Sequence, residues 1–203
     1  MSLKSKIVII FPYKFSVNNH LRYEIDMYEK YCDVTILEIA PIAAPEYESI
    51  PPKEKLYKGE NIKYLKTFKE LISELSKFDD SVLIINPIPA FDGFRELIVN
   101  FLITRSKSRV ISIMNPGLHI NTLHKRNFFK SFLGLMLRKL YYFFNAPDYF
   151  FVAGSEFYNK SKKYLPSKTK ILFGHSYDYS FVLSKKHIDK PDLDFNYAVL
   201  IDE

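Results

Sequence analysis

The sequence has little cysteine, no tryptophan and only 6 glycines among its 203 residues. The single cysteine, Cys32, excludes an intrachain disulfide framework and a cysteine-based metal cluster. Cys32 also closes an apolar stripe with helical spacing, so we interpret it as a buried core thiol rather than as a nucleophile. No secretory signal opens the chain, because the apolar run Ile7–Phe11 is too short for one. We therefore expect a cytoplasmic protein.

Common motifs for binding cofactors and metals are also absent. No Gly-x-Gly-x-x-Gly sequence follows the first apolar run, and no Gly-Lys-Ser/Thr phosphate-binding loop occurs. These absences argue against a dehydrogenase and against a P-loop enzyme. No His-x-x-x-His, cysteine pair or carboxylate–histidine cluster has metal-ligand spacing, so we expect no metal site and no bound cofactor. Asp192-Leu-Asp194 matches the Asp-x-Asp pattern of some transferases, but it lies in a polar stretch rather than after a buried strand.

The composition indicates a globular protein with a basic surface. Hydrophobic residues make up 47% of the chain, which is enough for a packed core. The formal net charge of +6 suits an anionic partner such as a nucleotide phosphate, an acidic glycan or an anionic lipid. An evenly spread, solvated basic surface explains the same charge. We do not expect nucleic acid as a partner, because the basic residues mix with aliphatic ones rather than forming a stripe with exposed aromatics.

Six apolar runs predict buried parallel strands, because they are continuous rather than alternating. These runs are Lys6–Phe11, Asp33–Ile39, Ser81–Ile85, Arg109–Met114, Tyr149–Ala153 and Thr169–Phe173. Helical spacing connects three sets of apolar residues: Leu21, Ile25, Tyr28 and Cys32; Leu65, Phe68, Ile72 and Leu75; and Phe94, Leu97, Ile98, Phe101 and Leu102. The alternation predicts an α/β fold with a Rossmann-like, doubly wound, mainly parallel sheet of about six strands and helices on both faces. We expect Ile7–Phe11 and Arg109–Met114 to be central.

The order of these elements also predicts how the chain is divided. Residues 1–183 form the expected Rossmann-like domain. Residues 184–203 contain a polar, proline-bearing stretch and then the apolar run Asn196–Glu203, which we interpret as a linker and the first strand of a second domain. Pro41–Gly59, rich in proline and carboxylates, is a long excursion after the second strand, and such excursions are typical of lids or covering loops.

Polar side chains gather where the predicted strands end, which is the edge at which parallel α/β sheets bind ligands. The candidate site residues are Ser16, Asn18, Asn19, His20, Asn86, Asn115, His119, Ser155, His175 and Asp178. Asn86 and Asn115 each precede a proline, and such pairs are also ordinary turn formers, so both explanations stay open for them. The three histidines among these residues favour a cleft over a chance arrangement.

An aromatic and basic segment at residues 125–145 is the other unusual feature. Charges interrupt its apolar run, so it does not fit a bilayer span, which needs about 20 mainly apolar residues. A basic, aromatic helix can lie on an anionic membrane surface, and it can also pack against the sheet. Its proposed membrane-contact residues are Phe128, Phe129, Lys130, Phe132, Arg138 and Lys139.

Several of these features together resemble the N-terminal half of GT-B glycosyltransferases. They are the polar loop after the first strand, the aromatic and basic helix, and the sequences Asp148-Tyr-Phe-Phe-Val-Ala-Gly-Ser155 and Lys170-Ile-Leu-Phe-Gly-His175. The closing sequence His175-Ser-Tyr-Asp-Tyr179 and residues 197–203 are similar to bacterial surface-polysaccharide transferases. The resemblance covers nearly the whole chain.

The resemblance implies a transferase that moves a sugar from a nucleotide-sugar to a glycan or lipid-linked acceptor. In that family the N-terminal domain holds the acceptor, the second domain holds most of the nucleotide, and no metal is needed. A histidine soon after the first strand is the general base in inverting members, which implies that role for His20, with Asp178 as a carboxylate to orient it. In a retaining enzyme His20 would only line the acceptor pocket. A flavodoxin-like or sugar-phosphate binding module without catalysis is the alternative.

Overall fold

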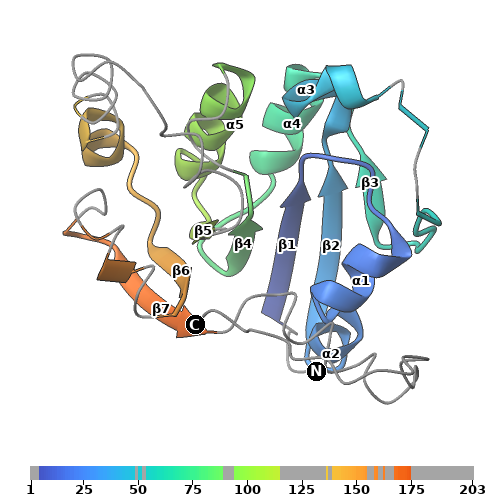
Figure 1. The fold of residues 1–203 in the computed structure, drawn as a ribbon, viewed down its shortest axis with the longest axis horizontal. Coiled ribbons are helices and arrows are strands. Elements are labelled where there is room, and N and C mark those ends of the chain that lie inside the picture. Colours follow the sequence, from blue (N-terminus) through green and yellow to red (C-terminus); the bar gives the residue numbers. More distant parts are fainter. Residues whose placement is uncertain are drawn as a thin grey trace, which may run out of the picture.

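The computed structural model describes residues 5–48, 50–51, 54–88, 94–114, 136, 139–154, 158–159, 162 and 167–174. Within these residues, seven parallel strands form one sheet in the order β3-β2-β1-β4-β5-β6-β7. Figure 1 shows them side by side, with β3 at one edge and β7 at the other. This is the predicted α/β, Rossmann-like fold, with one strand more than the six expected.

The elements have the following bounds. The strands are β1 (Ser5–Phe11), β2 (Cys32–Glu38), β3 (Ile62–Tyr64), β4 (Val82–Asn86), β5 (Arg109–Met114), β6 (Tyr149–Ala153) and β7 (Lys170–Gly174). The helices are α1 (Val17–Arg22), α2 (Ile25–Glu29), α3 (Ala40–Ala43), the 3₁₀ turn η1 (Pro45–Tyr47), α4 (Phe68–Leu75) and α5 (Phe94–Thr104). Both β1 and β5 are interior strands, with β4 between them, as their continuous apolar sequences require.

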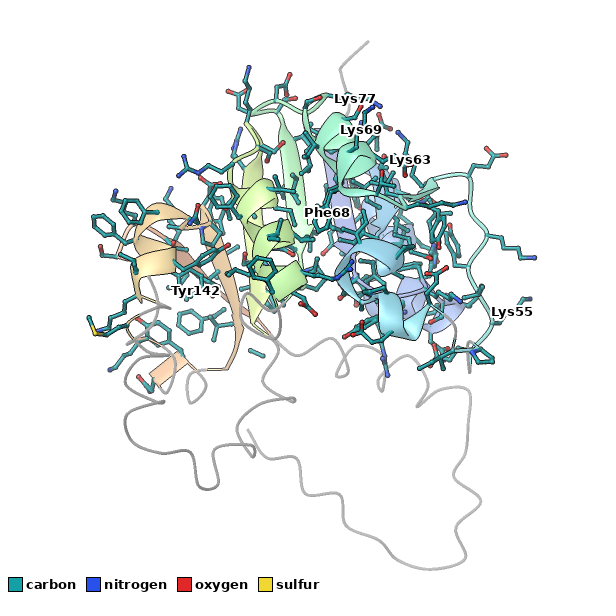
Figure 2. All side chains as sticks on the ribbon, turned by 90° about the horizontal axis from the view of Figure 1, so that it is seen from above. Lys55, Lys63, Phe68, Lys69, Lys77 and Tyr142 are labelled. Carbon is teal, nitrogen blue, oxygen red and sulfur yellow. The ribbon has the colours of Figure 1, made fainter. Side chains whose placement is uncertain are left out.

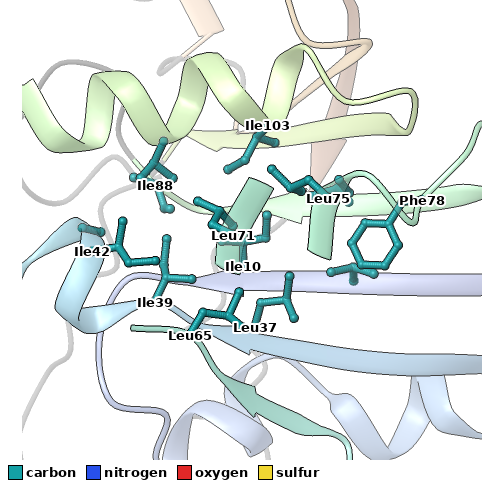
Figure 3. Close-up of a cluster of buried hydrophobic side chains, with 14 of the residues drawn as sticks. Ile10, Leu37, Ile39, Ile42, Leu65, Leu71, Leu75, Phe78, Ile88 and Ile103 are labelled. Atoms are coloured by element: carbon teal, nitrogen blue, oxygen red, sulfur yellow. The ribbon is translucent and has the colours of Figure 1, made fainter. Parts of the chain in front are cut away.

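Each face of the sheet carries its own apolar core, because successive side chains of a strand point to opposite faces. Val8 and Ile10 of β1 belong to the core that α3, α4 and α5 cover, and we call this side the α4 face. Figure 3 shows Ile10, Leu71 of α4 and Ile103 of α5 pointing into that core. Ile7 and Ile9 belong to the opposite core, which Ile25 of α2 and the segment before α1 cover, and we call this side the α1 face.

Predictions about the first helical stretch are wrong. Instead of one helix over residues 21–32, the chain forms two short helices, α1 and α2, because Glu24 between them adopts the left-handed conformation, with φ 50° and ψ 41°. Cys32 does not close a helical stripe, since it is the first residue of β2 and is only half-buried. Leu21, which the same stripe placed in the core, is exposed.

The second helical stretch and the missed strand lie next to each other in the chain. Helix α4 buries Leu71 and Leu75, whereas Ile72 of the predicted stripe is half-exposed. Strand β3 lies between the Pro41–Gly59 excursion and α4, and it pairs with β2 through Ile62 and Ile36. It has three residues, which is too short for a recognisable apolar run.

Candidate active site

Helix α1 begins at the carboxyl edge of the sheet. Ser16 caps it, because Ser16 Oγ accepts a hydrogen bond from Asn19 N at 3.1 Å and donates one to the Glu54 carboxylate. The preceding backbone is tied to the neighbouring strand, where Phe15 N donates to Glu38 Oε2 at 2.9 Å. Ser16, a predicted acceptor-binding residue, is buried and serves this cap.

His20, the predicted general base, lies one turn into α1. Its backbone N donates to Ser16 O at 3.1 Å, and the residue is only 9% exposed. Its ring stacks on Tyr57, with 4.3 Å between the ring centroids and 26° between the ring planes. Tyr57 belongs to the excursion that the sequence predicts to be a covering loop, and Tyr57 N donates to Phe15 O at 3.0 Å. The neighbouring Leu56 forms an antiparallel bridge with Ser16, so this part of the excursion covers His20.

Two carboxylates of α2 lie beside the His20 ring. His20 Nε2 is 3.7 Å from Asp26 Oδ1, and one ligand atom each from His20, Asp26 and Glu29 lie within 4.8 Å of one another. Asp26 and Glu29 are three residues apart and therefore share one side of α2. Both are exposed, whereas His20 is buried. We call these three residues the histidine–carboxylate cluster.

Polar neighbours hold the cluster from the side of β3. Asn61, which directly precedes β3, donates from Nδ2 to Glu29 Oε1 at 2.6 Å. The pKa of the Tyr57 hydroxyl is raised, first by burial and then by the negative charges of Glu29 and Asp26. The negative charges of both carboxylates therefore lie close to the imidazole of His20, where they stabilise a positively charged group.

Sequence reasoning missed Asp26 and Glu29. Ligand searches by sequence look for regular spacing on one element, and these residues meet His20 across the break between α1 and α2. The left-handed residue Glu24 makes that break, and nothing in the surrounding sequence marks it. Asp178, the carboxylate predicted to orient His20, lies outside the described residues, and within them Asp26 takes the place beside the ring.

Asn86, another predicted acceptor-binding residue, ends β4 and is fully buried. Its Nδ2 donates to Asn100 Oδ1 of α5 at 2.7 Å, and its Oδ1 accepts from Ile88 N at 3.1 Å. Both ends of the amide are therefore used to form the turn after β4 and to attach that turn to α5. Contact between Asn86 and an acceptor stays a prediction. The predicted residues Asn18 and Asn19 are half-buried on α1.

The remaining predicted site residues lie outside the described part of the chain. Whether they share one cleft with His20 therefore stays a prediction. They are Asn115, His119, Ser155, His175 and Asp178 for the site, and Phe128, Phe129, Lys130, Phe132 and Arg138 for the membrane contact.

In the aromatic and basic segment, the described residues 136 and 139–144 are helical. Tyr142 packs toward the sheet, with its ring centroid 5.5 Å from that of Phe150 in β6 (Figure 2). Among the described residues of this helix, Met136, Leu140, Phe143 and Phe144 are more than half exposed. Lys168 Nζ lies 5.9 Å from the centroid of the Phe143 ring. We call this surface the aromatic patch, and its members are Met136, Lys139, Leu140, Phe143, Phe144 and Lys168.

The described helices do not cross a membrane, because none of them has both the length and the apolar character of a span.

The histidine–carboxylate cluster is the part of the described structure with groups suited to catalysis or metal binding. A neutral imidazole can accept a proton near neutral pH, and a carboxylate beside it stabilises the cation that forms. The same groups are nitrogen and oxygen donors of the kind that bind divalent metal ions.

Comparison with known proteins gives no match. No family model matches the chain, and neither does any curated protein or any solved structure.

Proposed function

We propose that this chain is the acceptor-side domain of a glycosyltransferase in which His20 removes a proton from an acceptor hydroxyl group. The observation that carries the proposal is the setting of His20. It lies in the first helix after β1 of a parallel α/β sheet, it is buried, and the carboxylate of Asp26 lies 3.7 Å from Nε2. The fold alone supports many activities, so the proposal depends on this residue and its neighbours.

In this proposal the two ring nitrogens have different tasks. Because Asp26 faces Nε2, the N–H belongs on Nε2 and Nδ1 is the nitrogen that accepts the proton. As the acceptor oxygen bonds to the anomeric carbon, the bond from that carbon to the nucleotide phosphate breaks and the hydroxyl proton moves to Nδ1. Asp26 then stabilises the imidazolium. The separation of 3.7 Å is longer than a hydrogen bond, and such contacts often shorten only when substrate is bound.

The nucleotide-sugar is held mainly by the second domain that the sequence predicts. Helix-terminal amides and basic side chains there stabilise the departing phosphate. The reaction belongs to the assembly of a cell-surface polysaccharide, with a glycan or a lipid-linked sugar as acceptor.

Turnover by the natural full-length protein tests the proposal. The assay follows nucleotide release from a panel of nucleotide-sugars in the presence of glycan or lipid-linked acceptors. We expect His20→Ala to lower kcat by about 10²–10⁴-fold, since a general base contributes that much. Asp26→Asn gives a smaller loss, and Asp80→Asn, an exposed carboxylate before β4, leaves kcat unchanged. Undiminished turnover by His20→Ala would overturn the assignment of the base.

Direct titration separates the transferase from a binding module. The 203-residue chain alone is titrated with nucleotide-sugars by calorimetry, and we expect no tight binding because the phosphate-holding groups belong to the second domain. Micromolar binding by this chain would instead support the non-catalytic flavodoxin-like or sugar-phosphate binding module.

We also propose that the aromatic patch contacts an anionic membrane surface, where a lipid-linked acceptor is found. Phe143 and Phe144 are exposed and their rings lie 5.0 Å apart, while Lys139 and Lys168 supply positive charge beside them. Aromatic side chains with flanking cations are typical of surfaces that bind anionic lipid.

Co-sedimentation with liposomes tests the membrane contact. Binding should increase with the fraction of anionic lipid and fall with salt, because the attraction is screened. The double variant Phe143→Ser/Phe144→Ser should lose most of the binding, whereas Ile72→Ser, an exposed residue on α4, should keep it. Binding that ignores lipid charge, or that survives the double variant, would exclude this surface.

A further inference from the structure

The histidine–carboxylate cluster has the composition of a metal site. Its three members offer one imidazole nitrogen and two carboxylate oxygens, a donor set that suits Zn²⁺ and related transition metals. Exposed carboxylates are common on protein surfaces without any ion. Here, however, they face a histidine that is 9% exposed and whose ring is fixed by stacking on Tyr57.

The distances need little change to hold an ion. At bond lengths of about 2.0–2.2 Å, two ligand atoms of a tetrahedral zinc ion lie roughly 3.3–3.6 Å apart. His20 Nε2 and Asp26 Oδ1 are 3.7 Å apart, which is close to this spacing and too long for a hydrogen bond. The ligand atom of Glu29 lies within 4.8 Å of the other two. Since Glu29 is exposed, rotation of its side chain can bring it into range.

Surrounding residues already hold the Glu29 carboxylate and the helix that carries both acidic ligands. Asn61 holds the Glu29 carboxylate at 2.6 Å, and hydrogen bonds of this kind to a ligand strengthen metal binding. Ile25, the first residue of α2, is fully buried and anchors the helix that carries both carboxylates. The described residues give the ring of His20 no hydrogen bond within the usual limit, so Nε2 can offer its lone pair to an ion.

We propose that His20, Asp26 and Glu29 bind one divalent transition-metal ion of the Zn²⁺ class, with water completing its coordination. An imidazole ligand selects against Mg²⁺ and Ca²⁺, which prefer oxygen ligands alone. The inference does not rest on the proposed transferase. A metal on Nε2 takes the nitrogen that carries the N–H in the proposed general base, so His20 serves proton transfer only in the metal-free protein.

Calorimetric titration of the tag-free, chelator-treated 203-residue chain with Zn²⁺ tests the site. We expect Glu29→Gln and Asp26→Asn each to weaken zinc binding at least about tenfold, and Asn61→Ala to weaken it by about 10–100-fold through Glu29. Both carboxylates are exposed, so their replacement should leave the fold intact, which thermal melting checks. Asp80→Asn is the matched control and should bind zinc as the unchanged chain does.

The zinc affinities of these variants decide whether the site exists. Selective loss of zinc affinity in the Asp26 and Glu29 variants supports the site. Equal affinity in both variants and the unchanged chain would overturn it, because zinc would then be bound by other histidines among the five in the sequence. Absence of zinc binding, or equal binding of Mg²⁺, would overturn it too. None of these results depends on sugar transfer, so failure here leaves the turnover experiments to decide the proposed function.

Discussion

The two faces of the sheet are built in different ways. On the α4 face, α3, α4 and α5 pack apolar side chains such as Ile42, Leu71 and Ile103 into one cluster (Figure 3). On the α1 face, α2 and the segment before α1 cover a smaller cluster, and the left-handed residue Glu24 separates α1 and α2, which have six and five residues. That second face also places a buried histidine beside two carboxylates.

The two faces therefore differ in how they hold their charged side chains. Apolar burial stabilises the α4 face, and a buried charge there, Glu74, is neutralised by two lysines. The α1 face depends on contacts with a distant part of the chain, residues 54–57, and it keeps negative charge close to His20. Substitutions on the two faces should therefore differ both in which property they change and in how much they lower the free energy of unfolding.

The largest effect is expected from the apolar cores. Leu71→Ala and Ile25→Ala each remove a fully buried side chain and should lower the free energy of unfolding by about 2–5 kcal/mol. Only Ile25→Ala should also weaken zinc binding, because Ile25 anchors the helix that carries Asp26 and Glu29. Denaturant unfolding and zinc calorimetry on both variants measure this. Equal loss of zinc affinity in Leu71→Ala would remove the distinction between the faces.

The next effect concerns the buried carboxylate of the α4 face. Lys63 Nζ lies 2.5 Å and Lys77 Nζ 2.6 Å from the two oxygens of Glu74, and Figure 2 shows both lysines beside α4. Burial raises the pKa of Glu74, but the hydrogen bonds and charges of the lysines outweigh it, so the pKa is lowered. Glu74→Gln should cost about 1.5–3 kcal/mol at neutral pH.

The pH dependence of the destabilisation by Glu74→Gln tests whether the charge of Glu74 causes it. Because the folded pKa of Glu74 lies below its unfolded value, its contribution is present above the unfolded pKa of about 4.3 and is lost as the pH falls through the folded pKa. Unfolding followed between neutral and acidic pH should show the unchanged chain and Glu74→Gln converging in acid. A difference that stays constant with pH would mean that packing, not charge, explains it.

Glu38, on the side of the α1 face, should behave in the opposite way. Burial raises the pKa of Glu38, the hydrogen bond from Phe15 N lowers it, and the charge of Glu48 raises it further. A raised folded pKa means that stability falls as the pH rises from the unfolded pKa through the folded one. Glu38→Gln keeps an oxygen for Phe15 N and should remove this fall, which the same pH series measures.

A smaller effect comes from the helix caps, which form a matched pair. Ser16 caps α1 and Thr67 caps α4, each by accepting a hydrogen bond from the backbone three residues on, at 3.1 and 3.2 Å. Thr67→Ala should cost about 1 kcal/mol. Ser16→Ala should cost more, because its buried hydroxyl also donates to Glu54. Equal losses in denaturant unfolding would mean that the link to Glu54 adds nothing.

The smallest effect is a gain in stability. Glu24 has φ 50°, a conformation that glycine adopts without the steric cost of a side chain. Glu24→Gly should therefore stabilise the protein by roughly 0.5–1 kcal/mol. Glu29→Gly, at the last residue of α2, should instead lower stability, because its backbone is helical and the substitution also removes the hydrogen bond from Asn61. A loss of stability in Glu24→Gly would show that the side chain of Glu24 contributes more than its backbone costs.

The sequence predicted the fold well where local pattern decides structure. The β1 and β5 runs are apolar on both faces and therefore had to be interior strands. The pattern failed where tertiary contacts decide. Residues 21–32 have helical spacing, yet the backbone turns at Glu24, and β3 is an edge strand of three residues that only its pairing with β2 defines.

The candidate site was predictable only in part, for the same reason. His20 could be selected because it follows the first strand at the edge where α/β sheets bind ligands. Asp26 and Glu29 could not, because they reach His20 through a turn that has no sequence signature. Asn86 was selected by position, but its side chain is bound by Asn100, whose place depends on how α5 packs.

The bond between Ser16 and Glu54 joins residues 38 positions apart, and this separation has a consequence for the order of folding. A helix of six residues is not stable alone, so α1 should form only after β1 and β2 have paired and residues 54–57 have docked. Helix α4 has eight residues and a local cap at Thr67 that, within the described residues, forms no bond to a distant residue, so it can form earlier. The segment that holds His20 is then the last to form and the first to open, and its amide hydrogens should exchange with solvent sooner than those of α4.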